Sequence, residues 1–498
     1  MTTSATSASS RVGISAMAVY LPPYRVDLAQ WCAWTGNDVA KTRSVVGHAF
    51  RMPGPDQNAY TLAANAVLRL IERNAIDPRR IGYLALGTES SIDNAAGAVI
   101  VRGLVDQALA AQGKPTLARD CEVPEFKHAC LGGVYALKGG LRYLAVDGRG
   151  RQAIVVSSDI AEYARGSTGE PTQGAGAVAM LLEAEPKLLT LDLAAGGSAS
   201  AYRGLDFRKP FLRFAGQQPG HHGHLNDLPV FNGKYSTDCY IDATLSAMDA
   251  MFAHRDGPRS AWLAGLGAVF MHRPYHHMPR SGWAMAWLAA LGHDTAAGVD
   301  AAARELAGYC DKAGVALADL QAEWTRGTLS CEPDRLPEAA FPHLMAVRKA
   351  FGKSEAHQRI VKDKLRLGSD TMMELGNLYT AALPAWLAAG LDAAAKEGET
   401  LDGRDLLLLG YGSGDAAEAI PAHVVSGWQQ AAQAIAFDEA LAGAVNLDEA
   451  AYATLHDGGR IDGVDGNASG VVIDHIGTHT DNAFQDFGIA YYRFLGQP

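Results

Sequence analysis

The sequence lacks the marks of a secreted or membrane-bound protein. Its six cysteines are scattered over 498 residues without paired spacing, which excludes a disulfide framework or a zinc ribbon. Its apolar runs are short and broken by glycine, and none approaches the roughly 20 residues of a membrane-spanning helix. The first ten residues lack the charged start and the apolar stretch of a signal peptide. We therefore expect a cytoplasmic protein without membrane association, with a disordered tail over residues 1–11.

Long basic runs are also missing, and the formal net charge is −11 at pH 7. This charge argues against nucleic acid as a partner, although it is compatible with a local basic pocket for a phosphorylated ligand. Apolar residues, by contrast, are plentiful, because 48% of the chain is hydrophobic and only 19% is charged. This composition is typical of a globular protein with a large core, and the length suits about two or three domains or one large duplicated fold.

Helical and strand patterns alternate along the first part of the chain. Residues 60–74 carry apolar side chains at helical spacing, and residues 81–90 then have the pattern of a buried strand that ends in a loop of small residues. Residues 152–161 and 174–185 have the pattern of two further buried strands. This alternation predicts an α/β layered fold with a mostly buried sheet.

The later part of the chain repeats this pattern loosely. Residues 402–414 resemble residues 77–90, since each has a turn, an apolar strand and a glycine-rich loop. Residues 376–391 resemble residues 129–144, since each has a polar residue followed by a helix. Two related halves would bring such loops toward one centre, whereas chance similarity between alanine- and leucine-rich segments is the alternative.

These patterns suggest a division of the chain. We predict one half over residues 12–190 that contains a candidate nucleophile, Cys130, and a second half over residues 191–498. The repeat places Asn377 of the second half opposite Cys130. Residues 285–365 are rich in helical patterns and match neither half, so we expect them to form a helical insertion within the second half.

Cys130 lies in the stretch EFKHACLGGVYAL, residues 125–137, at the start of a predicted helix. Unpaired N–H groups and a partial positive charge at a helix start lower the pKa of a thiol. Gly132 and Gly133 cost helix stability and would let a ligand approach the backbone closely. The backbone N–H of Cys130 could also help to hold a thioester oxyanion. By itself, however, the motif fits a structural cysteine equally well.

Three other loops offer partners for a nucleophilic thiolate. Glu89 follows a buried strand, where a carboxylate can be desolvated and act as an acid or a base. His272 follows the strand-like segment AGLGAVF, and Asn377 lies in the segment ELGNLYT. Each of these residues taken alone could instead be an ordinary structural or solvated side chain.

Taken together, eight segments resemble the 3-hydroxy-3-methylglutaryl-CoA synthases, a family of thiolase-fold condensing enzymes. They occur in the order of that family over most of residues 12–280 and 366–415. The segments are LGTESSID, EFKHACLGGVYALKGGLRYL, VVSSDIAEYARGSTGEPTQGAGAVAMLL, DFRKPF, VFNGKYSTDCYIDA, AVFMHRPY, ELGNLYTAAL and GYGSG. The resemblance implies a thiolase-like fold with two pseudo-symmetric α/β/α/β/α halves, and a homodimer.

The resemblance also implies a reaction. Cys130 would attack acetyl-CoA and hold the acetyl group as a thioester. Glu89 would remove a proton from the acetyl methyl group, and the resulting carbanion would attack the ketone of acetoacetyl-CoA. His272 would assist binding and proton transfer at that ketone. Water would then release 3-hydroxy-3-methylglutaryl-CoA from the cysteine, and no cofactor beyond the coenzyme A thioesters would be needed.

Further positions follow from the same resemblance. Asn377 would fix His272 and the acceptor carbonyl, the backbone N–H of Ser413 beside Gly412 would meet the acyl oxygen, and Tyr163 would form a wall of the acyl pocket. The residues implied in coenzyme A binding are Thr172, Ser236, Lys209 and His277.

The chain departs from the family pattern where the substrate carrier would be held. His277 stands where family members often carry a lysine that meets the coenzyme A phosphates, and Arg273 stands in place of a serine. One alternative is therefore a β-branching relative of polyketide synthesis that acts on acyl carrier proteins. It would need a basic patch at the tunnel mouth, to which Arg273, Lys209 and Arg208 could contribute.

Two other interpretations stay open at this point. A ketoacyl synthase III-like enzyme would use Cys, His and Asn and depend less on Glu89, and a non-catalytic scaffold would not be acylated at Cys130. The histidines of the stretch PGHHGH, which are His221, His222 and His224, invite a metal site. We expect no metal, because the resembled family needs none and Asp227 is the only nearby carboxylate.

Overall fold

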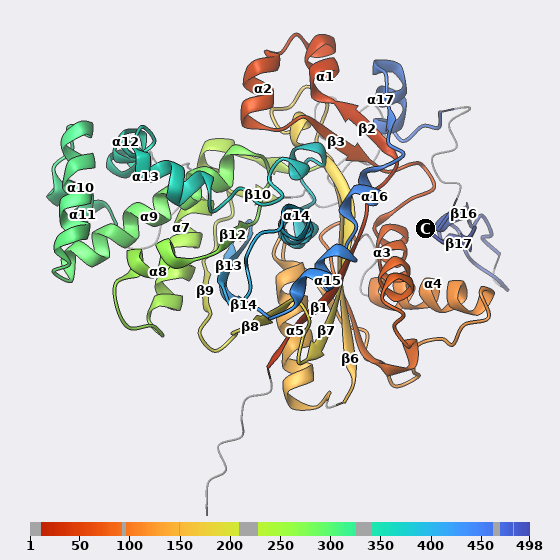
Figure 1. The fold of residues 1–498 in the computed structure, drawn as a ribbon. Coiled ribbons are helices and arrows are strands. Elements are labelled where there is room, and N and C mark those ends of the chain that lie inside the picture. The colour runs from red at the N-terminus through yellow and green to blue at the C-terminus, as the bar shows by residue number, and fades with distance from the viewer. Residues whose placement is uncertain are drawn as a thin grey trace, which may run out of the picture.

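The computed structural model describes residues 11–91, 96–148, 150–208, 228–324, 340–461, 469–481 and 483–498. A mixed sheet of ten strands runs through these residues (Figure 1). Its strands lie in the order β12 (Ala268–Met271), β13 (Asp405–Gly412), β14 (Ala416–Val424), β8 (Leu189–Leu191), β1 (Val12–Tyr20), β7 (Gly174–Ala184), β6 (Gln152–Ala161), β4 (Ile81–Gly87) and β5 (Glu125–Phe126), and β9 (Gly197–Ser200) pairs with β14.

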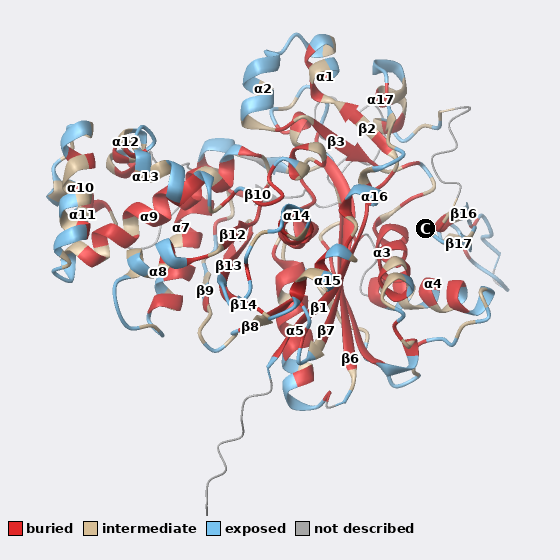
Figure 2. Cartoon of the chain, in the orientation of Figure 1, coloured by how far each residue is buried: buried red, intermediate tan, exposed pale blue. Residues whose placement is uncertain are grey.

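The strands are long apolar runs because helices cover both faces of the sheet, as the buried strands in Figure 2 show. Alternate residues of β1 point to opposite faces. Met17 and Val19 join a core cluster with α5 (Gly132–Val146) and α14 (Ala382–Glu397). Ala16 and Ala18 join a second cluster with α3 (Ala59–Arg73) and α4 (Gly97–Ala111). The predicted helix at 60–74 and the predicted strands at 81–90, 152–161 and 174–185 are confirmed as α3, β4, β6 and β7.

The two ends of the sheet repeat one topology. Strand β4 is parallel to β6, β6 is antiparallel to β7, and β7 is antiparallel to β1. In the same way, β12 is parallel to β13, β13 is antiparallel to β14, and β14 is antiparallel to β8 and β9. In the second half, β8 and β9 together thus hold the position that the single strand β1 holds in the first half. Strand β1 pairs with β8 where the two repeats meet. The prediction of two pseudo-symmetric halves is confirmed.

One part of the sequence comparison was wrong. The topology makes β13 the counterpart of β6, and β12 the counterpart of β4, so residues 402–414 do not correspond to residues 77–90. The pattern of a turn, an apolar strand and a glycine-rich loop recurs at several strands of the sheet. These strands can be told apart only by the neighbouring strand with which each forms an antiparallel pair. The pairing of α14 with α5 holds, because each helix lies between equivalent strands. The boundaries of the two predicted domains, 12–190 and 191–498, remain predictions, and the tail residues 1–10 lie outside the described residues.

Helices fill the described parts of residues 285–365, as predicted. They are α9 (His277–Ala296), α10 (Asp300–Ala313), α11 (Leu317–Trp324), α12 (Pro342–Phe351), α13 (Glu355–His357) and a single turn over Gln358–Lys362. Helix α9 begins earlier than the pattern suggested and joins the insertion directly to the loop after β12. In Figure 1 these helices extend to one side of the sheet.

Further elements surround the central layers. Helices α7 (Gly233–Phe252) and α8 (Arg259–Gly265) precede β12, and the C-terminal part contributes α15 (Trp428–Gln433), α16 (Phe437–Leu441) and α17 (Glu449–His456). The hairpins are β10 (Phe207–Arg208) with β11 (Val230–Phe231), and β16 (Val471–Ile476) with β17 (Ala490–Phe494). Among the helices of the described residues, none has the length and apolar character needed to cross a bilayer.

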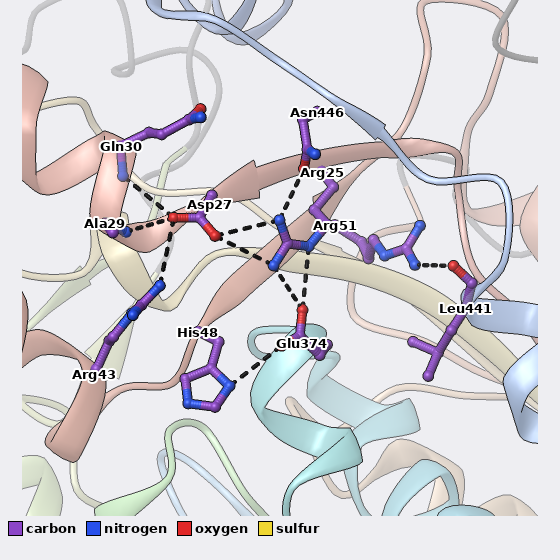
Figure 3. A network of polar contacts seen from close by, with 10 residues as sticks. All are labelled: Arg25, Asp27, Ala29, Gln30, Arg43, His48, Arg51, Glu374, Leu441 and Asn446. Atoms are coloured by element: carbon purple, nitrogen blue, oxygen red, sulfur yellow. Dashed lines mark hydrogen bonds and ion pairs between the residues drawn. The ribbon is translucent and has the colours of Figure 1, made fainter.

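A small N-terminal cap lies over one end of the sheet (Figure 1). It contains β2 (Tyr24–Asp27), α1 (Leu28–Thr35), α2 (Val39–Val45) and β3 (Ala49–Met52), with β15 (Val445–Asn446) pairing at its edge. Figure 3 shows how Glu374 anchors it: the Arg25 guanidinium donates to Glu374 at 3.1 and 2.7 Å, and His48 Nδ1 lies 3.2 Å from the same carboxylate. The cap thereby holds the segment that leads into Asn377.

Candidate active site

The loop that carries Cys130 packs tightly between the two halves. Ala129 has a φ of +39°, a strained conformation for a non-glycine residue, immediately before Cys130. A Cβ on Gly133 would lie 2.2 Å from Ser157 Oγ and 2.9 Å from the carbonyl oxygen of Thr380, and a Cβ on Gly132 would lie 2.7 Å from the carbonyl oxygen of Phe126. The expectation that these glycines admit a ligand was therefore wrong, because protein atoms occupy that space.

Cys130 and Glu89 face one another. Glu89 lies two residues beyond the end of β4, and its Oε2 accepts a hydrogen bond from Cys130 Sγ at 3.6 Å. The thiol is half-buried and packs against the rings of Tyr163 and Tyr379, whose centroids are 6.3 Å apart. The sulfur therefore has a carboxylate on one side and an aromatic wall on another.

The thiol is not a resting thiolate. Burial raises the pKa of Cys130 well above its usual value, and the neighbouring carboxyl groups of Glu89 and Asp159 raise it further. The sequence-based expectation of a lowered pKa was wrong, because these effects exceed any gain from the start of α5. The thiol must lose its proton during attack, and Glu89 is the acceptor within reach.

Asp159 connects the loops of the two halves. It lies in β6 and is completely buried. Its Oδ1 accepts hydrogen bonds from Thr88 Oγ1 and the N–H of Glu89 at 2.9 and 2.8 Å, and from the N–H and hydroxyl of Ser90 at 2.9 and 2.8 Å. Its Oδ2 accepts from the N–H of Thr380 at 2.9 Å and from the Thr380 hydroxyl. One carboxylate thus fixes the backbone of Glu89 against the segment that follows Asn377.

His272 directly follows β12, which is the counterpart of the strand β4 that leads to Glu89. Its ring is 2% exposed, and burial lowers its pKa to about 3, so the imidazole is neutral near pH 7. Its Nδ1 has no hydrogen-bond partner among the described residues. The backbone is fixed, since the N–H of His272 donates to the carbonyl of Leu409 at 2.8 Å and the Tyr240 hydroxyl donates to the carbonyl of His272 at 3.0 Å.

The loop after β13 approaches from the second half. The Tyr411 hydroxyl donates to Asp206 Oδ2 at 2.8 Å, and the N–H of Gly414 donates to the same oxygen at 3.3 Å. A Cβ on Gly412 would lie 2.7 Å from the carbonyl oxygen of His128, so only glycine allows this loop to meet the Cys130 loop. Ser413 follows directly and lines the same cavity as Cys130.

Asn377 is 2% exposed and lies between the same loops. Its N–H donates to the carbonyl of Thr172 at 3.0 Å, and its Oδ1 accepts from the N–H of Tyr379 at 2.9 Å. Because its oxygen is used within the loop, the amide group is held in one orientation at the wall of the cavity.

A cavity of about 300 Å³ joins most of these residues. Of the residues singled out from the sequence, it is lined by Cys130, Tyr163, Thr172, Ser236, His272, Asn377 and Ser413. Glu89 lines an adjoining cavity of about 680 Å³ instead, and it reaches Cys130 from that side. Gly412 packs against protein, His277 is exposed outside the cavity, and Lys209 lies outside the described residues.

Several residues that shape the site were missed from the sequence. Asp159 and Asp206 are buried carboxylates whose partners lie far away in the chain, and the only signal was an acidic residue in an otherwise apolar strand or motif. Val45 and Val46 line the cavity from the N-terminal cap, and nothing in the sequence pattern indicates this. His221, His222 and His224 lie outside the described residues, and the rest of the structure brings together no cluster of three metal-ligating side chains.

Comparisons with known proteins agree with this geometry. A family model described as hydroxymethylglutaryl-coenzyme A synthase N terminal matches residues 8–187. The hydroxymethylglutaryl-CoA synthase of Haloferax volcanii is 28% identical over 456 residues, covering 90% of this chain and 91% of that protein.

Solved structures extend the match to the whole fold. MvaS in complex with 3-hydroxy-3-methylglutaryl coenzyme A has a TM-score of 0.73 and 26% identity, over 97% of this chain and 99% of that chain. The HMG synthase of the curacin biosynthetic pathway, in complex with an acetyl donor-ACP, has a TM-score of 0.67 and 18% identity over the same shares, which supports the fold alone. The chain therefore belongs to the hydroxymethylglutaryl-CoA synthase family and is a thiolase-fold acyltransferase.

Proposed function

We propose that the protein condenses acetyl-CoA with acetoacetyl-CoA to give 3-hydroxy-3-methylglutaryl-CoA and free coenzyme A. The observation that carries this proposal is the contact of 3.6 Å between Cys130 Sγ and Glu89 Oε2 at the wall of a cavity that His272 and Asn377 also line. A ketoacyl synthase III-like reaction would not require a carboxylate at that distance from the thiol.

The first step is acetyl transfer to the thiol. Glu89 takes the proton of Cys130 as the sulfur attacks the thioester carbonyl, and coenzyme A leaves with a proton. This general-base role compensates for the raised pKa of Cys130. The N–H of Ser413 stabilises the oxyanion that forms at the acetyl carbonyl, and the Tyr163 ring limits the space around the methyl group.

The second step forms the carbon–carbon bond. Glu89 removes a proton from the acetyl methyl group, and the carbanion attacks the ketone of acetoacetyl-CoA. His272 is neutral because its pKa is lowered to about 3, so it donates a hydrogen bond to the ketone oxygen. The alkoxide that forms takes up one proton, which balances the proton that Glu89 has removed from the methyl group. Asn377 orients the acceptor beside this ring, and hydrolysis of the thioester to Cys130 releases the product.

The carriers and the assembly belong to the same proposal. Thr172 and Ser236 line the cavity where a pantetheine arm would enter, and His277 lies just outside it. The curacin relative binds a donor-ACP, which supports a carrier protein as an alternative source of the acetyl group. A homodimer and a cytoplasmic location remain predictions.

A substrate panel tests the proposed function. Wild-type protein, Cys130→Ala and His272→Ala are incubated with acetyl-CoA and acetoacetyl-CoA, and thiol release and product are followed. We expect product from the wild type only, acetyl transfer without condensation in His272→Ala, and neither in Cys130→Ala. Release of CO₂ from a malonyl thioester in place of condensation would instead establish a ketoacyl synthase.

A further inference from the structure

Arg273, which the sequence suggested for a basic patch at the tunnel mouth, is enclosed by the protein. It is 2% exposed, donates to Ser369 Oγ at 3.1 Å and stacks on Trp386, so it cannot meet an external partner. Lys209 and the side chain of Arg208 lie outside the described residues. Two arginines with fewer partners lie elsewhere, between the N-terminal cap and α3.

The first of them, Arg51 in β3, is buried beside backbone carbonyls. It is 3% exposed, and its guanidinium donates to the carbonyls of Pro22 at 3.3 Å and of Leu441 at 2.7 Å (Figure 3). Its Nε is buried without a hydrogen-bond partner among the described residues. Glu374 acts on Arg51 electrostatically, but its carboxylate is bonded to Arg25. Burial, together with the charge of Arg25, lowers the pKa of Arg51 to about 10, so the group is still a cation at pH 7.

The second, Arg69 in α3, has a similar environment. Its Nη1 donates to the carbonyl of Val19 at 2.9 Å, and its guanidinium carbon lies 4.7 Å from the centroid of the Tyr20 ring. Its Nε is also buried without a partner in the part of the chain that the structure describes. Within the described ranges, neither Arg51 nor Arg69 takes part in an ion pair. A guanidinium that is taken out of water without a carboxylate costs free energy, so both positions favour an anion.

Both arginines line one cavity of about 170 Å³. Ser469 and the end of α16 with the residues after it, from Glu439 to Gly443, form other parts of its wall. Glu439 is the acidic residue of this wall, and its carboxylate is bonded to Arg73, although its charge also reaches Arg69. The cavity therefore has two cationic donors and one carboxylate that already has a cation of its own.

We propose that this cavity binds a compact oxyanion with the size and charge of inorganic phosphate, held between Arg51 and Arg69. Arginine is suited to such ions because its planar group can donate two parallel hydrogen bonds to one oxyanion. The small volume suits an inorganic ion better than a nucleotide or another large ligand. The N–H of Arg51 donates to the carbonyl of Leu375 at 3.2 Å, so a bound ion would connect α3 with the cap and with the segment that leads to Asn377. This site is independent of the proposed condensation and should stabilise the native protein, because the ion binds the folded form.

The test follows the thermal unfolding midpoint of the full-length protein against the concentration of inorganic phosphate, at constant ionic strength. Sulfate and acetate serve as comparison ions. The variants are Arg69→Gln, which removes one cation of the cavity, Arg69→Lys, which retains the charge, and Glu439→Gln, which removes the carboxylate of the wall. The matched control is Arg79→Gln, which changes the net charge by the same amount as Arg69→Gln but lies outside the cavity, exposed and paired with Asp77.

We expect a saturable rise of the midpoint in the wild type with phosphate and sulfate, and a smaller rise with acetate. Arg69→Gln should weaken the apparent affinity for phosphate by about tenfold or more, because hydrogen bonds to a charged partner are lost, and Arg69→Lys should weaken it less. Glu439→Gln should strengthen the affinity, since it removes a like charge and frees that of Arg73.

Arg79→Gln should leave the affinity unchanged. A rise that does not saturate and is equal in all five proteins would show general salt stabilisation and overturn the inference. Saturable binding that Arg69→Gln leaves unchanged would place the ion elsewhere and overturn it as well. If Arg69→Gln does not fold, the exposed Glu439→Gln still decides, because an affinity that it fails to strengthen would refute the site.

Discussion

Asp159 gives the sharpest prediction about how the site is held. In the variant Asp159→Asn, an NH₂ group replaces one of two oxygens that together accept six hydrogen bonds. Whichever oxygen is lost, the new N–H group faces a backbone N–H, either that of Thr380 or those of Glu89 and Ser90. Because the site is completely buried, no water compensates for the donor left unpaired.

The structure sets the magnitude. A buried N–H without an acceptor costs about 1–3 kcal/mol, and the remaining bonds lose the strength that a charged acceptor gives them, about 1 kcal/mol. We therefore expect the free energy of unfolding to fall by about 2–4 kcal/mol. If the loop of Glu89 relaxes by even about 2 kcal/mol, condensation slows about 30-fold.

A second readout separates positioning from simple destabilisation. The Asp159 charge contributes to the raised pKa of Cys130, so removing it should lower that pKa. The rate of Cys130 alkylation by iodoacetamide, measured against pH, should then rise at lower pH than in the wild type, although condensation is slower. The control is Ser158→Ala, which removes a hydrogen bond of 2.7 Å to the carbonyl of Ala59 from the same strand without touching the Glu89 loop. An Asp159→Asn protein with an unchanged alkylation profile and wild-type condensation would refute this account of the site.

Two further predictions concern stability. Gly133→Ala should lower the free energy of unfolding, measured by urea titration, by about 1–3 kcal/mol, because its Cβ would lie 2.9 Å from the carbonyl oxygen of Thr380. The control is Gly103→Ala in α4, where a Cβ meets open space, and it should raise the free energy of unfolding by about 0.5–1 kcal/mol. A Gly133→Ala protein as stable as the wild type would contradict the packing described. Burial lowers the pKa values of His272 and His276 to about 3. Below about pH 6.5 the unfolded chain therefore binds more protons than the native protein. The free energy of unfolding is thus highest above that pH and falls as the pH decreases toward about 3. For each such histidine, the free energy of unfolding should fall by about 1.4 kcal/mol per pH unit as the pH decreases. His276→Gln, in which the side chain can still contact Arg273, should reduce this slope between about pH 6 and 4 by up to the same amount. An unchanged slope would show that His276 is not buried in its neutral form.

Much of the fold follows from local patterns. The helix α3 and the strands β4, β6 and β7 are marked by apolar residues whose spacing a single segment reveals. The pairing of strands is a different matter, because any apolar strand with a glycine-rich end satisfies the same pattern. The counterpart of β13 therefore became clear only from its antiparallel partner β14.

The candidate site shows the same division. Cys130, His272 and Asn377 each stand next to the end of a strand or the start of a helix, and the repeated topology brings such positions to one cavity. The electrostatics could not be predicted, because the pKa of Cys130 depends on burial and on Asp159. The contact between Asp159 and Thr380 joins the two halves, and no local pattern contains it.

The central claim is that Glu89 acts as the base for an acetyl group carried by Cys130, and exchange of the acetyl methyl protons tests it most directly. Wild-type protein and Glu89→Gln are incubated with acetyl-CoA in D₂O, and deuterium in the acetyl group bound to Cys130 is measured by peptide mass spectrometry. We predict deuterium incorporation in the wild type, and in Glu89→Gln a slower acetylation of the same cysteine without incorporation. Equal incorporation in both proteins, or acetylation at another residue, would contradict the account.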